Sequence, residues 1–314
     1  MMLILILNAL SAVLTLRGQV SMTDLTTIGG NGCFIRIEEV ASDRYGNIYV
    51  TDAYRFTVKK FSPEGNLLVE FGKRGNKNSD FKTSPYKIIC YGETLAIVAK
   101  GTACVQLFTD NFIYLGQFSL PGIITDIIFN RAGKIIATII PYDQKEQHRL
   151  LLVDKSGKIL AGAPTNVSGA GQAFDMTHVS AGKGDTFIVA YRFRNMIVLY
   201  TDRLKIIKYF SVPSFPTEAP SVAAADPEIG KLPEGDLIKD ICTDPYGNIF
   251  VLGGDYTESP NRDVYLFGPD GTFVTSFKLP YKSGIIHINQ QGHLFTREDQ
   301  RTVLKRYDLR LPDN

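Results

Sequence analysis

The sequence contains no tryptophan, and among its 314 residues only four are histidine and four are cysteine. The histidines are scattered, and no two have the spacing of metal ligands on one element: His148, His178, His287 and His293. The cysteines include no C-x-x-C pair, which argues against a zinc knuckle: Cys33, Cys90, Cys104 and Cys242. Because free cysteines commonly act as small core residues, we expect four free thiols. Histidine-based and cysteine-based metal sites therefore have little support.

Neither sign of charge is in excess. The chain carries 34 basic and 32 acidic side chains, a formal net charge of +2. Proteins built around nucleic acid usually show a strong basic excess, so we expect no nucleic-acid partner.

No apolar run is long enough for a comfortable membrane span of about 20 residues. The N-terminus is apolar from Met1 to Leu16 and resembles the hydrophobic region of a secretory signal. No Lys or Arg precedes this run, and no clean A-x-A cleavage site follows it. We expect residues 1–17 to be a signal peptide or leader, residues 18–314 to form a single domain, and the protein to be extracytoplasmic, either periplasmic or secreted. The alternative is that the run forms a buried N-terminal strand.

The rest of the chain is a series of short β-branched and aromatic runs separated by turns. The pattern is clearest from Glu39 to Gly72 and returns from Cys242 to Phe277. The first turn of each unit contains a glycine, and these glycines recur at steps of 41 to 63 residues: Gly46, Gly92, Gly133, Gly184, Gly247 and Gly292. A period of this order with four strands per unit is the signature of a β-propeller. No window sustains the apolar spacing of a helix across three turns.

The predicted fold is an all-β, six-bladed β-propeller with four-stranded antiparallel blades. The expected blades occupy residues 37–72, 84–120, 123–161, 174–212, 237–279 and 284–310. The last blade supplies only three strands, while the run Gln19–Ile28 is left over. We therefore expect this N-terminal strand to complete the last blade and close the ring, because closure removes exposed sheet edges. Pro213–Asp236 is predicted to be a long surface loop without sheet pairing, since it is rich in proline and small residues.

Two of the units resemble NHL repeats, a family of six-bladed propellers. The motif D-x-x-G-N-I-Y-V-x-D followed by V-x-x-F-x-x-x-G stands at Asp43–Asp52 with Val58–Gly65, and again in part at Asp244–Val251 with Val264–Gly271. The family often has Asn-x-Arg before that valine, where this chain has Arg55, Phe56 and Thr57. NHL repeats occur in bacterial surface proteins, in lyases and in interaction domains, so the resemblance implies a fold more than an activity.

One candidate site lies in the expected central channel. Lactonase-like propellers use Glu, Asn and Asp around a calcium ion there, and we expect Asp126, Asp175 and Asp240 on innermost strands at related positions. Oxygen ligands from neighbouring blades can hold a hard cation. The alternative is that these carboxylates only cap strand starts or bond to neighbouring backbone groups.

A second candidate site lies on the rim formed by the loops between second and third strands. Counting back six residues from the end of each third strand gives an arginine in blades one, four and six: Arg55, Arg194 and Arg301. The same count gives Thr102, Gln147 and Asn261 in the other blades. With Tyr54 and Tyr191 beside them, these arginines suit a carboxylate, a phosphate or a protein partner. The alternative is a solvated rim whose arginines pair locally with Asp52, Asp255, Glu298 or Asp299.

The sequence thus favours a non-enzymatic propeller without a cofactor, which binds a protein or a small acidic ligand on its rim face. The alternative function is a metal-dependent lyase or hydrolase with calcium in the central channel.

Overall fold

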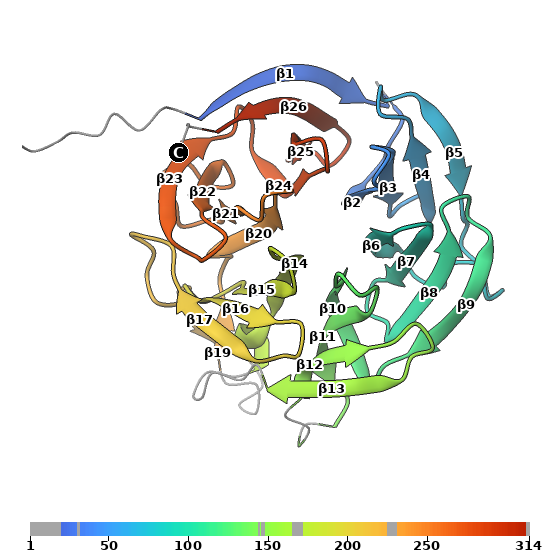
Figure 1. Cartoon of the computed structure of the whole chain (residues 1–314), viewed down its shortest axis with the longest axis horizontal. Helices are drawn as coiled ribbons and strands as arrows, with labels where there is room; N and C mark the ends of the chain where they lie inside the picture. Colours follow the sequence, from blue (N-terminus) through green and yellow to red (C-terminus); the bar gives the residue numbers. More distant parts are fainter. Residues whose placement is uncertain are drawn as a thin grey trace, which may run out of the picture.

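The structure is a computed structural model that describes residues 20–29, 32–143, 145, 148–164, 172–224 and 231–311. The expected leader, residues 1–17, and Gln147 of the expected rim lie outside these residues. The described chain forms six four-stranded antiparallel sheets arranged as blades around a central channel (Figure 1). The predicted all-β, six-bladed propeller is confirmed.

Each blade is a simple meander from the channel outward. Blade one contains β2 (Ile37–Ser42), β3 (Ile48–Asp52), β4 (Thr57–Phe61) and β5 (Leu67–Phe71). Blade two contains β6 (Pro85–Tyr91), β7 (Thr94–Ala99), β8 (Cys104–Thr109) and β9 (Tyr114–Ser119). Blade three contains β10 (Gly122–Phe129), β11 (Ile135–Pro141), β12 (His148–Val153) and β13 (Ile159–Pro164). Blades four and five contain β14 (Thr177–Ala181), β15 (Thr186–Tyr191), β16 (Ile197–Thr201) and β17 (Ile206–Phe210); and β20 (Ile238–Thr243), β21 (Ile249–Gly253), β22 (Asp263–Phe267) and β23 (Phe273–Lys278).

The sixth blade closes the ring as predicted. Its strands β24 (Ser283–Ile288), β25 (His293–Glu298) and β26 (Leu304–Arg310) are joined on the outside by β1 (Ser21–Ile28). β1 pairs antiparallel with β26 from Ser21 opposite Arg310 to Ile28 opposite Leu304, with one irregularity between Asp24 and Thr26. Figure 1 shows the first strand lying along the outer edge of the last blade. The pairing covers an edge that would otherwise be open.

The apolar core lies between neighbouring blades, and this explains why the strands alternate only partly. Every residue of β3 and of β4 is buried, whereas the outer strand β5 is mostly exposed. Between blades one and two, Tyr49 and Val58 pack with Leu95 and Phe108. A strand that is buried on both faces needs apolar residues at consecutive positions.

The recurring Asp-x-x-Gly-Asn turns hold the first two strands of a blade together. The Asp43 carboxylate accepts hydrogen bonds from the backbone amides of Tyr45 and Asn47, both at 2.9 Å. Gly46 adopts a φ of 85°, which a residue with a side chain rarely adopts. The turn that begins at Asp244 repeats the same carboxylate-to-amide bonds. The spacing of Asp, Gly and Asn in the sequence therefore predicts this turn.

The segment after blade four corrects one expectation. Within Pro213–Asp236, β18 (Ser221–Ala223) and β19 (Lys231–Pro233) pair as a small antiparallel sheet. The prediction of a loop without sheet pairing is therefore wrong. The only proline in the two paired strands is Pro233, which stands at the end of its strand, so the other paired residues keep the backbone amides that a sheet needs. The described part of the segment also packs on blade four, where the Ala219 amide donates to the Phe193 carbonyl at 2.8 Å.

All four cysteines are free, in agreement with the expectation from their number and spacing. Among the described residues, no helix has the length and apolar character needed to cross a membrane.

Candidate ligand-binding site at the mouth of the central channel

Five of the six innermost strands carry an ionisable side chain at one shared position that faces the channel. Each of these residues immediately precedes a buried β-branched residue of its strand, so the carboxylate, amine or imidazole alternates with a core position. They are Glu39 of β2, Lys87 of β6, Asp126 of β10, His178 of β14 and Asp240 of β20. The sequence prediction found Asp126 and Asp240 but missed Glu39, Lys87 and His178. The shared position before Val or Ile in the first strand of each blade was the signal that could have found them.

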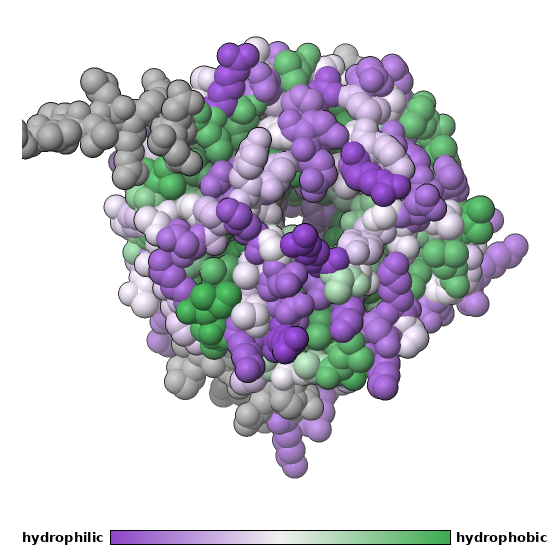
Figure 2. All heavy atoms as spheres, viewed as in Figure 1, coloured by the Kyte–Doolittle hydropathy of each residue, from purple (hydrophilic) through white to green (hydrophobic). Residues whose placement is uncertain are grey.

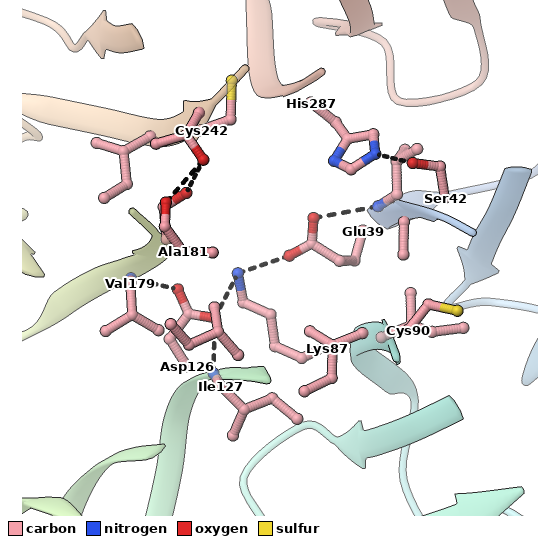
Figure 3. A pocket seen from close by; sticks show the side chains of 18 of the residues that line it. Glu39, Ser42, Lys87, Cys90, Asp126, Ile127, Val179, Ala181, Cys242 and His287 are labelled. Carbon is pink, nitrogen blue, oxygen red and sulfur yellow. Dashed lines mark hydrogen bonds and ion pairs between the residues drawn. The ribbon is translucent and has the colours of Figure 1, made fainter. Parts of the chain in front are cut away.

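Lys87 joins two of the carboxylates across the channel. Its Nζ lies 2.6 Å from Glu39 Oε2 and 3.1 Å from Asp126 Oδ1 (Figure 3). Burial alone disfavours the ammonium, but the carboxylates of Asp126 and Glu39 outweigh it and raise the pKa of Lys87 well above its usual value. Burial raises the pKa of Glu39, against the opposing attraction of Lys87. Lys87 is therefore a fixed cation inside the channel.

Asp126 and Asp240 also tie neighbouring blades together. Asp126 Oδ2 accepts a hydrogen bond from the Val179 amide at 3.0 Å, and Asp240 Oδ2 accepts one from the Ile286 amide at 2.8 Å. Burial, followed by the negative charge of Glu39, raises the pKa of Asp240 to about 8. Asp240 is thus largely protonated at neutral pH.

His178 stands between these two carboxyl groups. Its Nδ1 is 3.9 Å from Asp126 and 3.8 Å from Asp240. Burial, with the nearby cations Lys87 and Arg192, lowers the pKa of His178 well below its usual value, so the imidazole is neutral at neutral pH.

Asp175 does not share this place. The prediction put it on an innermost strand, but it lies at the end of the 3-10 helix η1 (Gln172–Asp175), and its Oδ1 is 3.8 Å from Arg194. The chain enters blade four through this short helix and β14 begins only at Thr177, so His178 takes the channel position. Within the described ranges, no group of three His, Cys, Asp or Glu side chains has the arrangement of a metal site. Calcium in the channel stays an untested prediction.

One mouth of the channel is lined mainly by basic side chains. A hollow of about 270 Å³ opens there, on the face that carries the loops between second and third strands. Its outer basic residues come from blades one, two, four, five and six: Arg36, Lys100, Arg192, Lys239, Arg297 and Arg301. We call these six residues the basic mouth. The central opening of the channel is visible in Figure 2, in the viewing direction of Figure 1.

Two carboxylates neutralise only part of the basic mouth. Glu38 pairs with Arg36 and with Arg301, the latter at 3.4 Å. Asp236 pairs with Arg192 and with Lys239, the latter at 2.7 Å. Within the described chain, the six cations thus share two carboxylates as ion-pair partners. Deeper in the same hollow, Glu39 pairs with Lys87 and Asp240 is the remaining acidic group, so the mouth keeps a local positive excess.

Arg297 is a buried member of the basic mouth. It is only 6% exposed, and its Nη1 donates to the Ile37 carbonyl at 2.9 Å. Its Nε is buried without a hydrogen-bond partner among the described residues. Burial, followed by the charge of Arg301, lowers the pKa of Arg297. A buried guanidinium in this state gains from an incoming anion.

The expected rim residues divide into exposed and buried groups. Tyr54 is 66% exposed, and the side chains of Arg55 and Arg301 are 36% and 41% exposed. Tyr191 and Arg194 are only 2% and 7% exposed, so the expectation that they face solvent on the rim is wrong. The reason for Arg194 is the segment after blade four, which pairs with it through Glu218 and covers it.

Arg55 and Arg301 make different contacts. Arg55 donates to the carbonyl groups of Cys33 and Gly32 and lies 4.0 Å from Asp52, which is the local pairing of the alternative interpretation. Arg301 instead belongs to the basic mouth.

The opposite end of the channel holds a second hollow of about 250 Å³, drawn in Figure 3. There, Ser42 Oγ and His287 Nε2 share a hydrogen bond of 2.8 Å. Burial lowers the pKa of His287 to about 4, so this imidazole is neutral and a weak base. Lys87, Glu39 and Asp240 line both hollows and mark the level at which they meet.

Comparison with known proteins supports the fold and leaves the chemistry open. No protein-family model matches the chain, and no curated protein sequence matches it. Similar solved structures include virginiamycin B lyase from Staphylococcus aureus, with 12% identity, a TM-score of 0.57, and coverage of 93% of this chain and 90% of that one. The propeller domain of Cps50 (Swd1) from Myceliophteria thermophila has 13% identity, a TM-score of 0.56, and coverage of 92% and 99%.

A structural-genomics protein of unknown function from Bacteroides thetaiotaomicron is also similar, with 9% identity, a TM-score of 0.61, and coverage of 94% of this chain and 73% of that one. At such identities the likeness concerns the fold alone. The class that the structure defines is therefore a six-bladed β-propeller with a basic channel mouth.

Proposed function

We propose that this protein is a non-enzymatic binding propeller whose ligand carries an acidic group and binds at the basic mouth. The observation that carries the proposal is the convergence of six cations from five blades on one opening, where, among the described residues, only Glu38 and Asp236 form ion pairs with them. We keep two further parts of the sequence interpretation as proposals. The first is a relation to the NHL repeats, which the Asp-x-x-Gly-Asn turns support, and the second is export directed by residues 1–17, which their apolar sequence supports.

The physical reason is electrostatic focusing. Like charges that line a concave opening add their potentials, and the low-dielectric walls of the channel reduce screening by water. Arginine also offers a planar fork that matches carboxylate and phosphate oxygens. Arg297 lines the hollow, and its Nε is a hydrogen-bond donor without an acceptor in the part of the chain that the structure describes. Water or an anion can supply that acceptor.

The alternative, a metal-dependent lyase or hydrolase in the channel, has less support. One of the similar structures is a lyase, but the Lys87 ammonium lies between Glu39 and Asp126, where a divalent cation would need those oxygens. A metal at this level would have to displace a lysine whose charge is stabilised by both carboxylates. The same geometry fits an anion-binding site at the basic mouth, with the ion pairs of Lys87 to Glu39 and Asp126 lying deeper in the channel.

A thermal-shift experiment with citrate and inorganic phosphate tests the proposal. Both anions should raise the melting temperature of the wild type, and high salt should weaken the effect because the contacts are ionic. The double variant Lys100→Ala/Arg301→Ala should raise the apparent Kd at least about tenfold, as expected for the loss of charged anchors. Glu38 keeps Arg36 as its partner in this variant, so the fold should persist.

Arg203→Ala is the matched control, since Arg203 is exposed on a turn of blade four away from the mouth. It should bind the anions as the wild type does. If neither anion shifts the melting temperature, or if the double variant and the control respond alike, the mouth is ordinary solvated surface.

A further inference from the structure

We infer that the ligand is a peptide segment in which an acidic residue is followed by apolar ones, and that Tyr54 is the platform for its apolar part. This inference rests on the proposed function of the basic mouth and specifies what is attached to the acidic group. It is carried by the continuity between the mouth and an exposed aromatic surface on blade one.

Tyr54 lies between two hollows that both reach the basic mouth. One, of about 320 Å³, is lined by Ala53, Tyr54 and Phe56 together with Arg36 and Lys100. The other, also of about 320 Å³, is lined by Ile35 and Tyr54 together with Arg36 and Arg301. Every basic residue that lines these two hollows also lines the mouth. The three hollows therefore form one continuous surface across blades one, two and six.

The apolar part of this surface is unusual for its position. Tyr54 is 66% exposed and Ile35 is 48% exposed, and both flank Arg36. Single exposed apolar residues need no explanation, but these two lie next to a charged opening, where the surrounding residues are polar. The Arg36 guanidinium lies 5.9 Å from the centre of the Tyr54 ring, so one side chain touches both the basic and the apolar part.

The chemistry of this combined surface favours a peptide over a free anion. A phosphate or a small carboxylate would use the mouth and leave both hollows beside Tyr54 unfilled. An extended peptide directs successive side chains to opposite sides, so an acidic side chain can enter the mouth while its neighbours lie over Tyr54 and Ile35. Tyrosine and arginine are also the residue types that contribute most at protein interfaces. Charge complementarity selects the acidic residue, and the exposed ring selects the apolar one.

Isothermal titration calorimetry with two blocked peptides tests the inference: acetyl-Glu-Glu-Phe-Leu-amide and acetyl-Glu-Glu-Ser-Ser-amide. The wild type should bind the apolar peptide about tenfold more tightly, because burying a Phe or Leu side chain contributes at this level. Tyr54→Ala should lower the affinity for the apolar peptide to that for the serine peptide, without changing the latter. Since Tyr54 is exposed, its replacement should leave the fold intact.

Tyr246→Ala is the matched control. Tyr246 is 75% exposed on a turn between the first two strands of blade five, on the opposite face. It should alter neither peptide's affinity.

The outcomes separate this inference from the proposed function. If both peptides bind equally, Tyr54→Ala changes nothing and Lys100→Ala/Arg301→Ala weakens both, the peptide inference is overturned and the anion-binding mouth stands. If adenosine monophosphate binds in a Tyr54-dependent way and the peptides do not, the platform serves a nucleotide and the inference is again overturned. If the peptides, citrate and phosphate all fail to bind, the proposed function fails as well.

Discussion

Asp240 is the residue at which the channel interior should be most sensitive to pH. Its carboxyl group is buried between His178 and the Ile286 amide, with Glu39 and Lys87 also lining the channel at this level. Burial and Glu39 raise its pKa from 3.8 to about 8. The folded protein therefore holds a proton on Asp240 that the unfolded chain has released at neutral pH.

The sign of the resulting pH dependence follows from this difference. Between the unfolded and folded pKa values, the folded state binds more protons, so the free energy of unfolding falls as pH rises toward 8. His178 acts in the opposite sense, because its pKa is lowered from 6.5, but its effect is confined to lower pH. The window between 6.5 and about 8 thus lies above the range in which His178 acts, and the raised pKa of the neighbouring Glu39 acts in the same sense as that of Asp240.

Asp240→Asn should flatten this decline. The amide cannot titrate, and its oxygen can still accept the bond from Ile286. Between pH 6.5 and 7.5 the wild type should lose about 1 kcal/mol of unfolding free energy relative to the variant. Urea unfolding at several pH values measures this difference. Asp299→Asn, at an exposed position, should keep the wild-type slope; parallel curves for Asp240→Asn and wild type would show that Asp240 ionises normally.

At the residue scale, the sequence could indicate chemistry but not exposure. Arg194 and Arg301 occupy the same place in their blades, yet one is buried against Asp175 and the other lines the basic mouth. The difference comes from the segment after blade four, which folds back over its own blade. No local pattern around Arg194 reports a contact that a distant segment makes. By contrast, the sequence could have predicted Glu39 and Lys87, because each immediately precedes a β-branched residue, Val40 or Ile88, in the first strand of its blade.

At the scale of elements, the strand that closes the ring is the one with the widest consequence. β1 pairs along its whole length with β26 and brings Ile28 into the core between blades one and six, where it is fully buried. A ring closed in this way holds its first and last blades together without a disulfide. This element could be predicted because a missing strand and a surplus strand matched in number.

Deleting residues 1–28 should destabilise the whole propeller, whereas deleting residues 1–16 should not. The longer deletion removes the β1 pairing and the Ile28 contacts and exposes the edge of β26. Its melting temperature should fall by at least about 5 °C, since a few kcal/mol shifts a domain of this size by that amount. Calorimetric melts of both truncations beside the full chain measure the effect. Equal melting temperatures for all three would contradict the closure account.

The turns and the segment after blade four show where element prediction succeeds and fails. An Asp-x-x-Gly-Asn turn is specified by carboxylate-to-amide bonds within five residues, so the sequence contains all of its determinants. The β18–β19 pair joins residues about ten positions apart across a stretch rich in alanine and proline, and its composition predicts a loop. Contacts with blade four place this segment, and those contacts are not local.

At the scale of the whole molecule, the distribution of charge matters more than its sum. A net charge of +2 gives no hint of a binding face. The ring brings Arg36, Lys100 and Arg301 to one opening although they are far apart in the chain. The sequence predicted the fold and the correct face for Arg301 and Tyr54, but not the basic mouth, because its members come from different strands and loops of five blades. Propeller geometry, rather than any motif, assembles it.

The most direct measurement is a crystal structure of the protein with citrate, at a concentration about tenfold above its measured Kd. We expect citrate density in the hollow of the basic mouth, with carboxylate oxygens within hydrogen-bond distance of Lys100, Arg301 or Arg297. Density for citrate at another surface, with the mouth filled only by water, would contradict it.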